Sequence, residues 1–133
     1  MFDATFRATW APCALSALRI VAGFMFMQHG LSKYFAFPAA SPPTFQMMSQ
    51  LGAAGAIEIV CGLLIGVGLF TSPAAFIASG MCAIGFFQYH LPRGFFPQAN
   101  GGELIALYCW VFFYLFLAGG GSWSLDALRS GRR

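Results

Sequence analysis

Three ionisable side chains lie in stretches of this chain that are otherwise apolar: Arg19, His29 and Glu58. Glu58 stands in the apolar run 51–70 and is the one charged residue between positions 34 and 92. A carboxylate in such a run is costly in hydrocarbon unless it is paired or faces a protected interior. A carboxylate and an imidazole can also exchange protons with a bound ligand as general acid and base. Glu58 and His29 are therefore the candidate catalytic residues.

The composition indicates the solvent in which these residues must be positioned. Of the 133 residues, 59% are hydrophobic and 8% are charged, which favours a lipid bilayer over water. The length predicts a single domain covering residues 1–133. A net charge of +3 is too small to indicate a nucleic-acid partner. We therefore expect the lipid bilayer to be the principal surrounding of the chain.

The apolar runs predict an all-α membrane protein, a bundle of four transmembrane helices. The connection 71–73 is so short that the second and third spans must form an antiparallel hairpin, and the glycine run 119–121 ends the last span. The first span lacks a small-residue cleavage site, so we expect it to be retained rather than removed as a signal peptide. The spans are expected at about 12–34, 50–70, 73–90 and 103–118.

Two helical stripes place the candidate residues inside the bundle. Both combine small residues with charges, and glycine lets helices approach closely. The first stripe is Arg19, Gly23, Phe26, Gly30 and Lys33, and the second is Gly55, Glu58, Gly62 and Gly66. From the depth of each residue we predict an Arg19–Glu58 pair with His29 as its neighbour. Such a pair either fixes the register of the helices or forms a proton relay or ligand site.

The loop end of the bundle adds two further candidates, Lys33 and Glu103. Asn100 and Glu103 have the spacing of a near-capping box at the start of the last span. Alternatively, Glu103 lines the mouth of a polar cavity and pairs with Lys33. The predicted ligand-binding set is therefore Arg19, His29, Lys33, Glu58 and Glu103.

No metal site is expected, because His29 and His90 lack a third ligand at suitable spacing. The four cysteines fall one per span without a CxxC motif, which is typical of small core residues. Basic residues near the span ends predict the orientation. Arg7, Arg129, Arg132 and Arg133 lie on the side of the termini, and Lys33 and Arg93 lie on the other. We therefore expect both termini to be cytoplasmic.

Four stretches resemble the DoxX family in the same order along the chain. Residues 19–35 (RIVAGFMFMQHGLSKYF) resemble its first span, with an Arg, a glycine-containing apolar run and an HGxxK motif. Residues 58–71 (EIVCGLLIGVGLFT) resemble its second span. Residues 100–103 (NGGE) and 119–126 (GGGSWSLD) resemble the elements that open and close its last span, with Gly120 where the family usually has Pro.

This resemblance implies a small, multi-pass, four-helix protein of the bacterial inner membrane. Its relatives include a subunit of thiosulfate:quinone oxidoreductase and partners of soluble redox enzymes. One hypothesis is a subunit of a membrane-associated redox complex with a quinone site built from Arg19, His29 and Glu58. No cofactor motif is evident in the chain, so electrons would come from a partner. The alternative is a noncatalytic membrane anchor, assembly factor or permeation component. Both leave room for other membrane subunits and a homo-oligomer.

Overall fold

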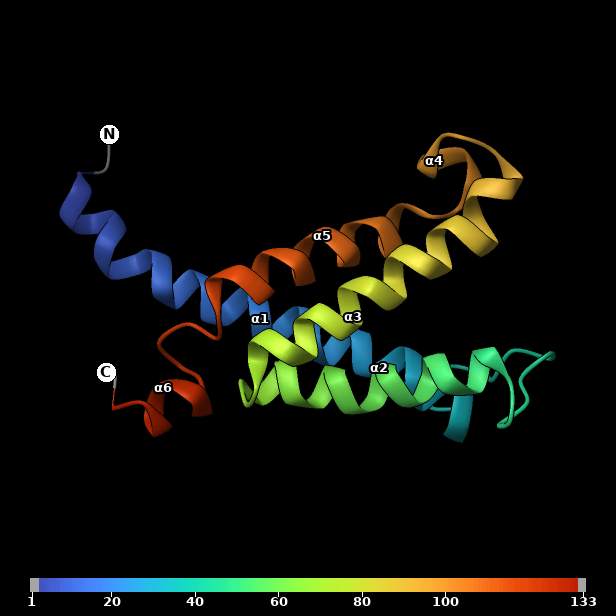
Figure 1. Cartoon of the computed structure of the whole chain (residues 1–133), viewed down its shortest axis with the longest axis horizontal. Helices are drawn as coiled ribbons and strands as arrows, with labels where there is room; N and C mark the ends of the chain where they lie inside the picture. Colours follow the sequence, from blue (N-terminus) through green and yellow to red (C-terminus); the bar gives the residue numbers. More distant parts are fainter. Residues whose placement is uncertain (1–2, 132–133) are drawn as a thin grey trace.

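In the computed structural model, which describes residues 3–131, every regular element is a helix (Figure 1). Four helices form the body of the molecule: α1 (Ala4–Phe35), α2 (Gln50–Val67), α3 (Thr71–Gly85) and α5 (Glu103–Ala118). Four short elements lie beside them: the π-helical turn η1 (Phe86–His90), the 3-10 turn η2 (Leu91–Arg93), α4 (Pro97–Asn100) and α6 (Leu125–Arg129). The all-α prediction is confirmed.

Three helical stretches within the described residues are long and apolar enough to cross a membrane. These are α1, α2 and the continuous run from α3 through η2, Thr71–Arg93. The fourth apolar helix, α5, has 16 residues. That corresponds to about 24 Å, less than the ~30 Å of a bilayer core. The structure thus supports a membrane protein, and a count of four spans remains a prediction.

The helices are arranged as two packed pairs. α1 packs against α2 and α3 packs against α5, while α2 and α3 contact each other less extensively. The pairs meet at the turn between α2 and α3 and diverge away from it (Figure 1). The beginning of α1 and the short helix α6 lie at the same end of the molecule as this turn. We call this the terminal end, and the opposite end, which holds the connection 36–49 and η1, the loop end.

Helix α1 begins before the predicted span. The Asp3 side chain accepts a hydrogen bond from the Phe6 N–H at 2.7 Å and caps the helix at Ala4, whereas the span was expected to begin at Pro12. Pro12 lies inside the helix. Ser16 Oγ donates to the Pro12 carbonyl at 2.8 Å. The N-terminal cap therefore extends the helix beyond its most apolar part.

The turn between α2 and α3 lies at residues 68–70, so the predicted connection at 71–73 is wrong. Gly68 has φ 74° and its N–H donates to the Leu64 carbonyl, which ends α2 at Val67. Glycine adopts this left-handed conformation without steric cost. Thr71 already belongs to α3. Its N–H is satisfied by the Asp126 carboxylate, a partner that is 55 residues away in sequence.

The interface between α1 and α2 is built on the predicted glycine stripes. A Cβ atom added to Gly23 would lie 2.5 Å from the Gly66 nitrogen, and one on Gly62 would lie 2.8 Å from the Gly23 carbonyl oxygen. Farther along the interface, a Cβ on Gly30 would lie 3.0 Å from the Glu58 Cβ. Any side chain at Gly23 or Gly62 would separate the two backbones. The glycines therefore set the register that positions Glu58.

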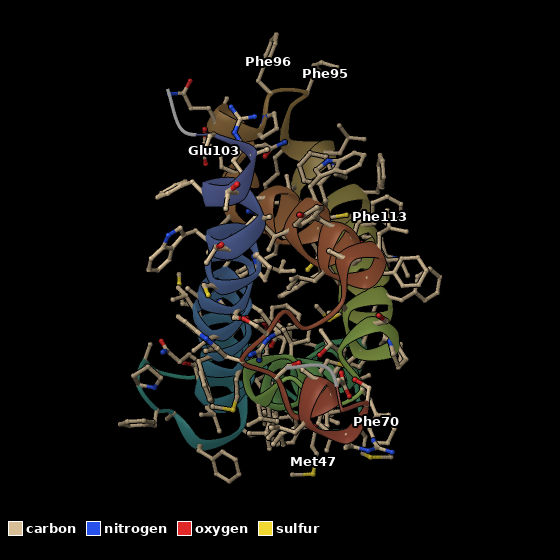
Figure 2. The ribbon with its side chains drawn as sticks, turned by 90° about the vertical axis from the view of Figure 1, so that its left-hand side faces the viewer. Met47, Phe70, Phe95, Phe96, Glu103 and Phe113 are labelled. Atoms are coloured by element: carbon tan, nitrogen blue, oxygen red, sulfur yellow. The ribbon has the colours of Figure 1, made fainter. Side chains whose placement is uncertain are left out.

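The outer surface of the molecule is rich in exposed aromatic side chains. Phe70, Phe95 and Phe96 point outward from connections between helices, and Phe113 points outward from α5 (Figure 2). An apolar exterior of this kind matches a lipid environment. The interior holds the hydrophobic cluster Ala22, Phe26, Cys61, Ile65, Ala74, Ala75, Ala78, Cys82, Tyr108, Phe112 and Leu115.

Candidate functional site

A cavity of about 760 Å³ lies between the two helix pairs, where they diverge towards the loop end. Side chains of α1, α2, α3, η1 and α5 line it, and most of this lining is apolar. Its volume is within the range of pockets for small organic ligands, about 300–1,000 Å³. The polar side chains of the lining are His29, Lys33, Gln50, Glu58, Gln88, Tyr89, His90 and Tyr108.

Glu58 forms a salt bridge with Lys33 in this cavity. Lys33 Nζ donates to Glu58 Oε2, and the two side chains are 13% and 9% exposed. The predicted Arg19–Glu58 pair is therefore wrong, because the partner of the carboxylate comes from the other end of α1. The pair is nearly buried yet lines the cavity, so a bound ligand can reach two charged groups that neutralise each other.

The direction of side chains on a helix explains this exchange of partners. Side chains on an α-helix lean towards its N-terminus. On α1 that direction takes Lys33 from the loop end towards Glu58, and its stem passes Gly55. The same direction takes Arg19 away from Glu58 and towards the terminal end. Depth alone, without side-chain direction, predicted the wrong pair.

Arg19 is fully buried outside the cavity, where its guanidinium holds the terminal end together. Nε donates to the Gly120 carbonyl at 2.7 Å, and Nη2 donates to the Trp123 carbonyl at 2.8 Å. Nη1 donates to the last carbonyls of α2, at Ile65 (2.6 Å) and Gly66 (2.5 Å). A cation suits the negative end of a helix dipole and its unpaired carbonyls. The structure thus separates Arg19 from the other predicted ligand-binding residues.

Asp126 adds further hydrogen bonds at the terminal end. Its carboxylate accepts hydrogen bonds from the N–H groups of Phe70 and Thr71, both at 2.9 Å, and so caps the start of α3. Burial alone would raise the pKa of the Asp126 carboxyl, but the hydrogen bonds from Thr71 and Phe70 and the charge of Arg129 hold this pKa below its ordinary value. Folding therefore favours the ionised form of the Asp126 carboxyl.

His29 lines the same cavity as Lys33 and Glu58. Its ring lies edge-on to Tyr108, with centroids 6.0 Å apart. Tyr108 is 6% exposed, and its hydroxyl has no hydrogen-bond partner among residues 3–131. Burying a hydroxyl without a hydrogen-bond partner costs free energy, because its bonds to water are lost. A ligand oxygen that accepts a hydrogen bond from this hydroxyl would offset that cost. Sequence reasoning missed Tyr108, because an aromatic residue in a hydrophobic span carries no distinguishing pattern.

Glu103 is exposed and lies outside the cavity lining. The predicted Lys33–Glu103 pair is wrong, because Lys33 is held by Glu58. Asn100 does not cap α5, whose N-cap residue is Gly102. Instead the Asn100 side chain accepts from the Gly102 N–H and donates to the Gly94 carbonyl, both at 2.8 Å. It thus fixes the fold of the connection before α5.

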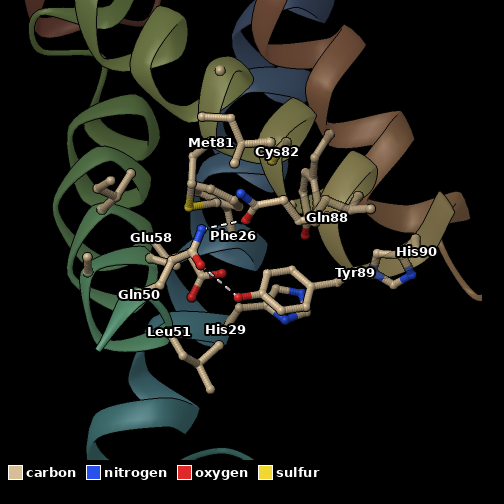
Figure 3. Close-up of a pocket in the computed structure, with 18 of the residues that line it drawn as sticks. Phe26, His29, Gln50, Leu51, Glu58, Met81, Cys82, Gln88, Tyr89 and His90 are labelled. Carbon is tan, nitrogen blue, oxygen red and sulfur yellow. Dashed lines mark hydrogen bonds between the residues drawn. The ribbon is translucent and has the colours of Figure 1, made fainter. Parts of the chain in front are cut away.

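Three polar side chains bridge the two helix pairs at the loop end of the cavity (Figure 3). Gln50 Nε2 donates to Gln88 Oε1 at 2.5 Å, and the Tyr89 hydroxyl donates to Gln50 Oε1 at 3.0 Å. Gln50 is the first residue of α2, whereas Gln88 and Tyr89 belong to η1. We call these three residues the loop-end bridge. The sequence offers no motif for it, because Gln50 lies nearly forty positions before Gln88 and Tyr89.

The four cysteines are free thiols, and among residues 3–131 no group of three or more His, Cys, Asp or Glu side chains comes together. Within the cavity lining, the ion pair, the imidazole of His29 and the Tyr108 hydroxyl can each contact a ligand. These groups can bind and orient an oxygen-bearing organic molecule and exchange protons with it.

The fold and the cavity define an all-helical membrane protein with a ligand-sized space inside its helices. The DoxX family model matches residues 14–91, so the chain belongs to the DoxX family, as the four motifs indicated. An uncharacterized protein of Haemophilus influenzae is 42% identical over 122 residues, which cover 88% of this chain and 91% of that protein. No solved structure gives a significant match. The family match includes Lys33 and Glu58 and ends before α5.

Proposed function

We propose that this protein is the quinone-binding membrane subunit of a redox complex. One observation carries the proposal: the largely apolar cavity contains a nearly buried Lys33–Glu58 pair. A quinone has an apolar ring with two carbonyl oxygens, and its isoprenoid tail keeps it in the bilayer. The apolar lining suits the ring, and the polar groups suit the oxygens.

The polar groups of the cavity also suit the chemistry of a quinone. Reduction to the quinol adds two electrons and two protons, one proton to each oxygen. The Lys33 ammonium can donate a hydrogen bond to an oxygen on which negative charge develops. Glu58 and His29 both line the cavity and would exchange protons with the quinone oxygens, and the Tyr108 hydroxyl would donate a hydrogen bond to one of them. The electrons would come from a redox partner protein.

The proposal includes a topology in the bacterial inner membrane. α5 would complete a four-span bundle with both termini in the cytoplasm. The ion pair strengthens this orientation, because Lys33 is neutralised by Glu58 and does not act as a free loop cation. Among the described residues Arg93 is then the remaining cation of the loop end, and Arg7 and Arg129 lie at the terminal end. Arg132 and Arg133, which entered the same prediction, lie outside the described residues.

Mass spectrometry of the protein extracted from its native membrane in mild detergent tests the proposal. We expect stoichiometric quinone with the unaltered protein and a loss of about tenfold or more in Glu58→Gln, because the variant loses a charged hydrogen bond in the site. Glu103→Gln is the matched control, since Glu103 is exposed and outside the cavity. Equal quinone in folded Glu58→Gln and Glu103→Gln would refute the site. Bulk lipid with a copurifying soluble enzyme would instead identify an anchor.

A further inference from the structure

We infer that the ligand enters the cavity sideways from the bilayer, between α2 and α3, and that it is a lipid-soluble molecule with an uncharged, oxygen-bearing head and a long apolar tail. The inference rests on the proposed function for the position of the head. It adds the route of entry, the class of tail and the part of the protein that determines both.

Polar side chains that are hydrogen-bonded to one another cross the loop end of the cavity. The loop-end bridge joins the first residue of α2 to η1 through two hydrogen bonds (Figure 3). His90 lies beside it in the lining and contacts the Asn100 carbonyl through Nδ1 at 3.2 Å. Entry from water at this end would break hydrogen bonds between helices that diverge here.

The side between α2 and α3 is open and apolar. Gly80 is an exposed part of the cavity lining, and a Cβ added there would meet no atom within 4 Å. Ile77 and Ile84, about one helical turn away on either side of it, also line the cavity and are 49% and 55% exposed. In a membrane this edge of α3 faces acyl chains. Gly80 therefore leaves a gap through which an apolar tail can extend into lipid.

The charges that line the cavity favour a ligand whose head group is uncharged. Lys33 and Glu58 neutralise each other, so an anionic head such as a phosphate would leave a net negative charge in a low-dielectric site. The unpartnered Tyr108 hydroxyl can donate to an oxygen of an uncharged head. Apolar lining residues of α2 and α3, such as Ala53 and Ile77, surround the path of the tail. An uncharged head therefore suits the polar groups of the cavity, and an apolar tail suits the lining contributed by α2 and α3.

Tryptophan fluorescence tests the lateral opening without any quinone. Ile105→Trp places a probe in the lining, in a background where the exposed Trp10, Trp110 and Trp123 are replaced by Phe. In phosphatidylcholine vesicles with brominated acyl chains we expect quenching of the probe, reduced by about half or more in Gly80→Leu because the new side chain fills the gap. Ala56→Leu places the same side chain at an exposed position outside the lining and should leave quenching unchanged.

Stronger quenching by aqueous acrylamide than by brominated lipid would overturn lateral entry. So would equal quenching in Gly80→Leu and Ala56→Leu. A second measurement compares binding of long-tailed ubiquinone with binding of its tailless benzoquinone head. We expect Gly80→Leu to weaken the long-tailed compound by about tenfold or more, since its tail loses buried apolar contact, and to change the tailless one by less than about twofold.

The outcomes separate this inference from the proposed function. If neither quinone binds the unaltered protein but lipid quenching depends on Gly80, the quinone proposal fails and lateral entry stands. If both quinones bind and Gly80→Leu affects them equally, the quinone site stands and lateral entry fails. Circular dichroism and size-exclusion chromatography of each variant establish that the comparison is made on folded protein.

Discussion

Arg19 and Lys33 belong to the same helical stripe of α1 but lie in different surroundings. Arg19 is fully buried, and its guanidinium donates four hydrogen bonds to carbonyl oxygens of α2 and of the segment 120–123. Lys33 has one carboxylate partner and lines a cavity of about 760 Å³. Arg19 gives four of its five N–H donors to the fold, whereas Lys33 retains donors that a ligand can use.

The difference shows how to separate a structural charge from a functional one in a membrane protein. Both kinds are costly in lipid and both must be paired. A structural charge has nearly all of its hydrogen-bond donors or acceptors paired within the protein. A functional charge keeps some of them unpaired and next to a cavity. At Arg19 four of the five N–H donors are used. At Lys33 two of three donors are left, next to the cavity.

The largest expected effect is on the terminal end. Arg19→Met leaves buried carbonyls of two segments without a donor, so we expect the free energy of unfolding to fall by about 3 kcal/mol or more. Thermal unfolding in detergent, followed by circular dichroism, measures it. Arg7→Met is the matched control, because Arg7 is an exposed residue of the same helix, and its effect should stay within about 0.5 kcal/mol. Equal stability of the two variants would show that the hydrogen bonds of Arg19 do not stabilise the fold.

A smaller effect is expected at the ion pair, and it should be non-additive. Lys33→Met and Glu58→Gln each leave a nearly buried group without its charged partner, at a cost of about 1–3 kcal/mol. The double variant removes both charges, so we expect it to be more stable than the sum of the single effects predicts, by about 0.5–3 kcal/mol. Chemical or thermal unfolding of the four proteins gives this coupling. Strict additivity would mean that the pair contributes nothing as a pair.

The smallest effect concerns Asp126 and depends on pH. Since folding lowers the pKa of this carboxyl, it stabilises the protein above its unfolded pKa of about 4, and this contribution is lost as the pH falls through the lower folded pKa. We expect Asp126→Asn to lower the melting temperature at neutral pH and to flatten its decrease in acid. Melting curves between neutral pH and about pH 2, below both pKa values, measure this change. An identical acid profile in both proteins would contradict the role of Asp126 as the cap of α3.

The pattern of residues in the chain predicted much of the architecture. Apolar runs fixed the all-helical class, and the glycine run 119–121 marked the end of α5 at Ala118. The glycine stripes identified the faces of α1 and α2 that meet, because close approach requires the absence of a Cβ. The chain also identified Lys33, His29 and Glu58 as residues of interest, and the structure brings these three into one cavity.

Pairing and enclosure were decided by the tertiary structure. Opposing Gly23 with Gly62 and Gly66 sets a register in which Arg19 meets the end of α2, and the lean of side chains then joins Lys33 to Glu58. The packing of the two helix pairs brings Gln50 next to Gln88 and Tyr89. The segment after α5 likewise brings Asp126 to the start of α3. Local patterns specify which face of a helix is buried. The partner of each buried charge and the space beside it depend on how separate helices meet, since long-range packing sets those distances.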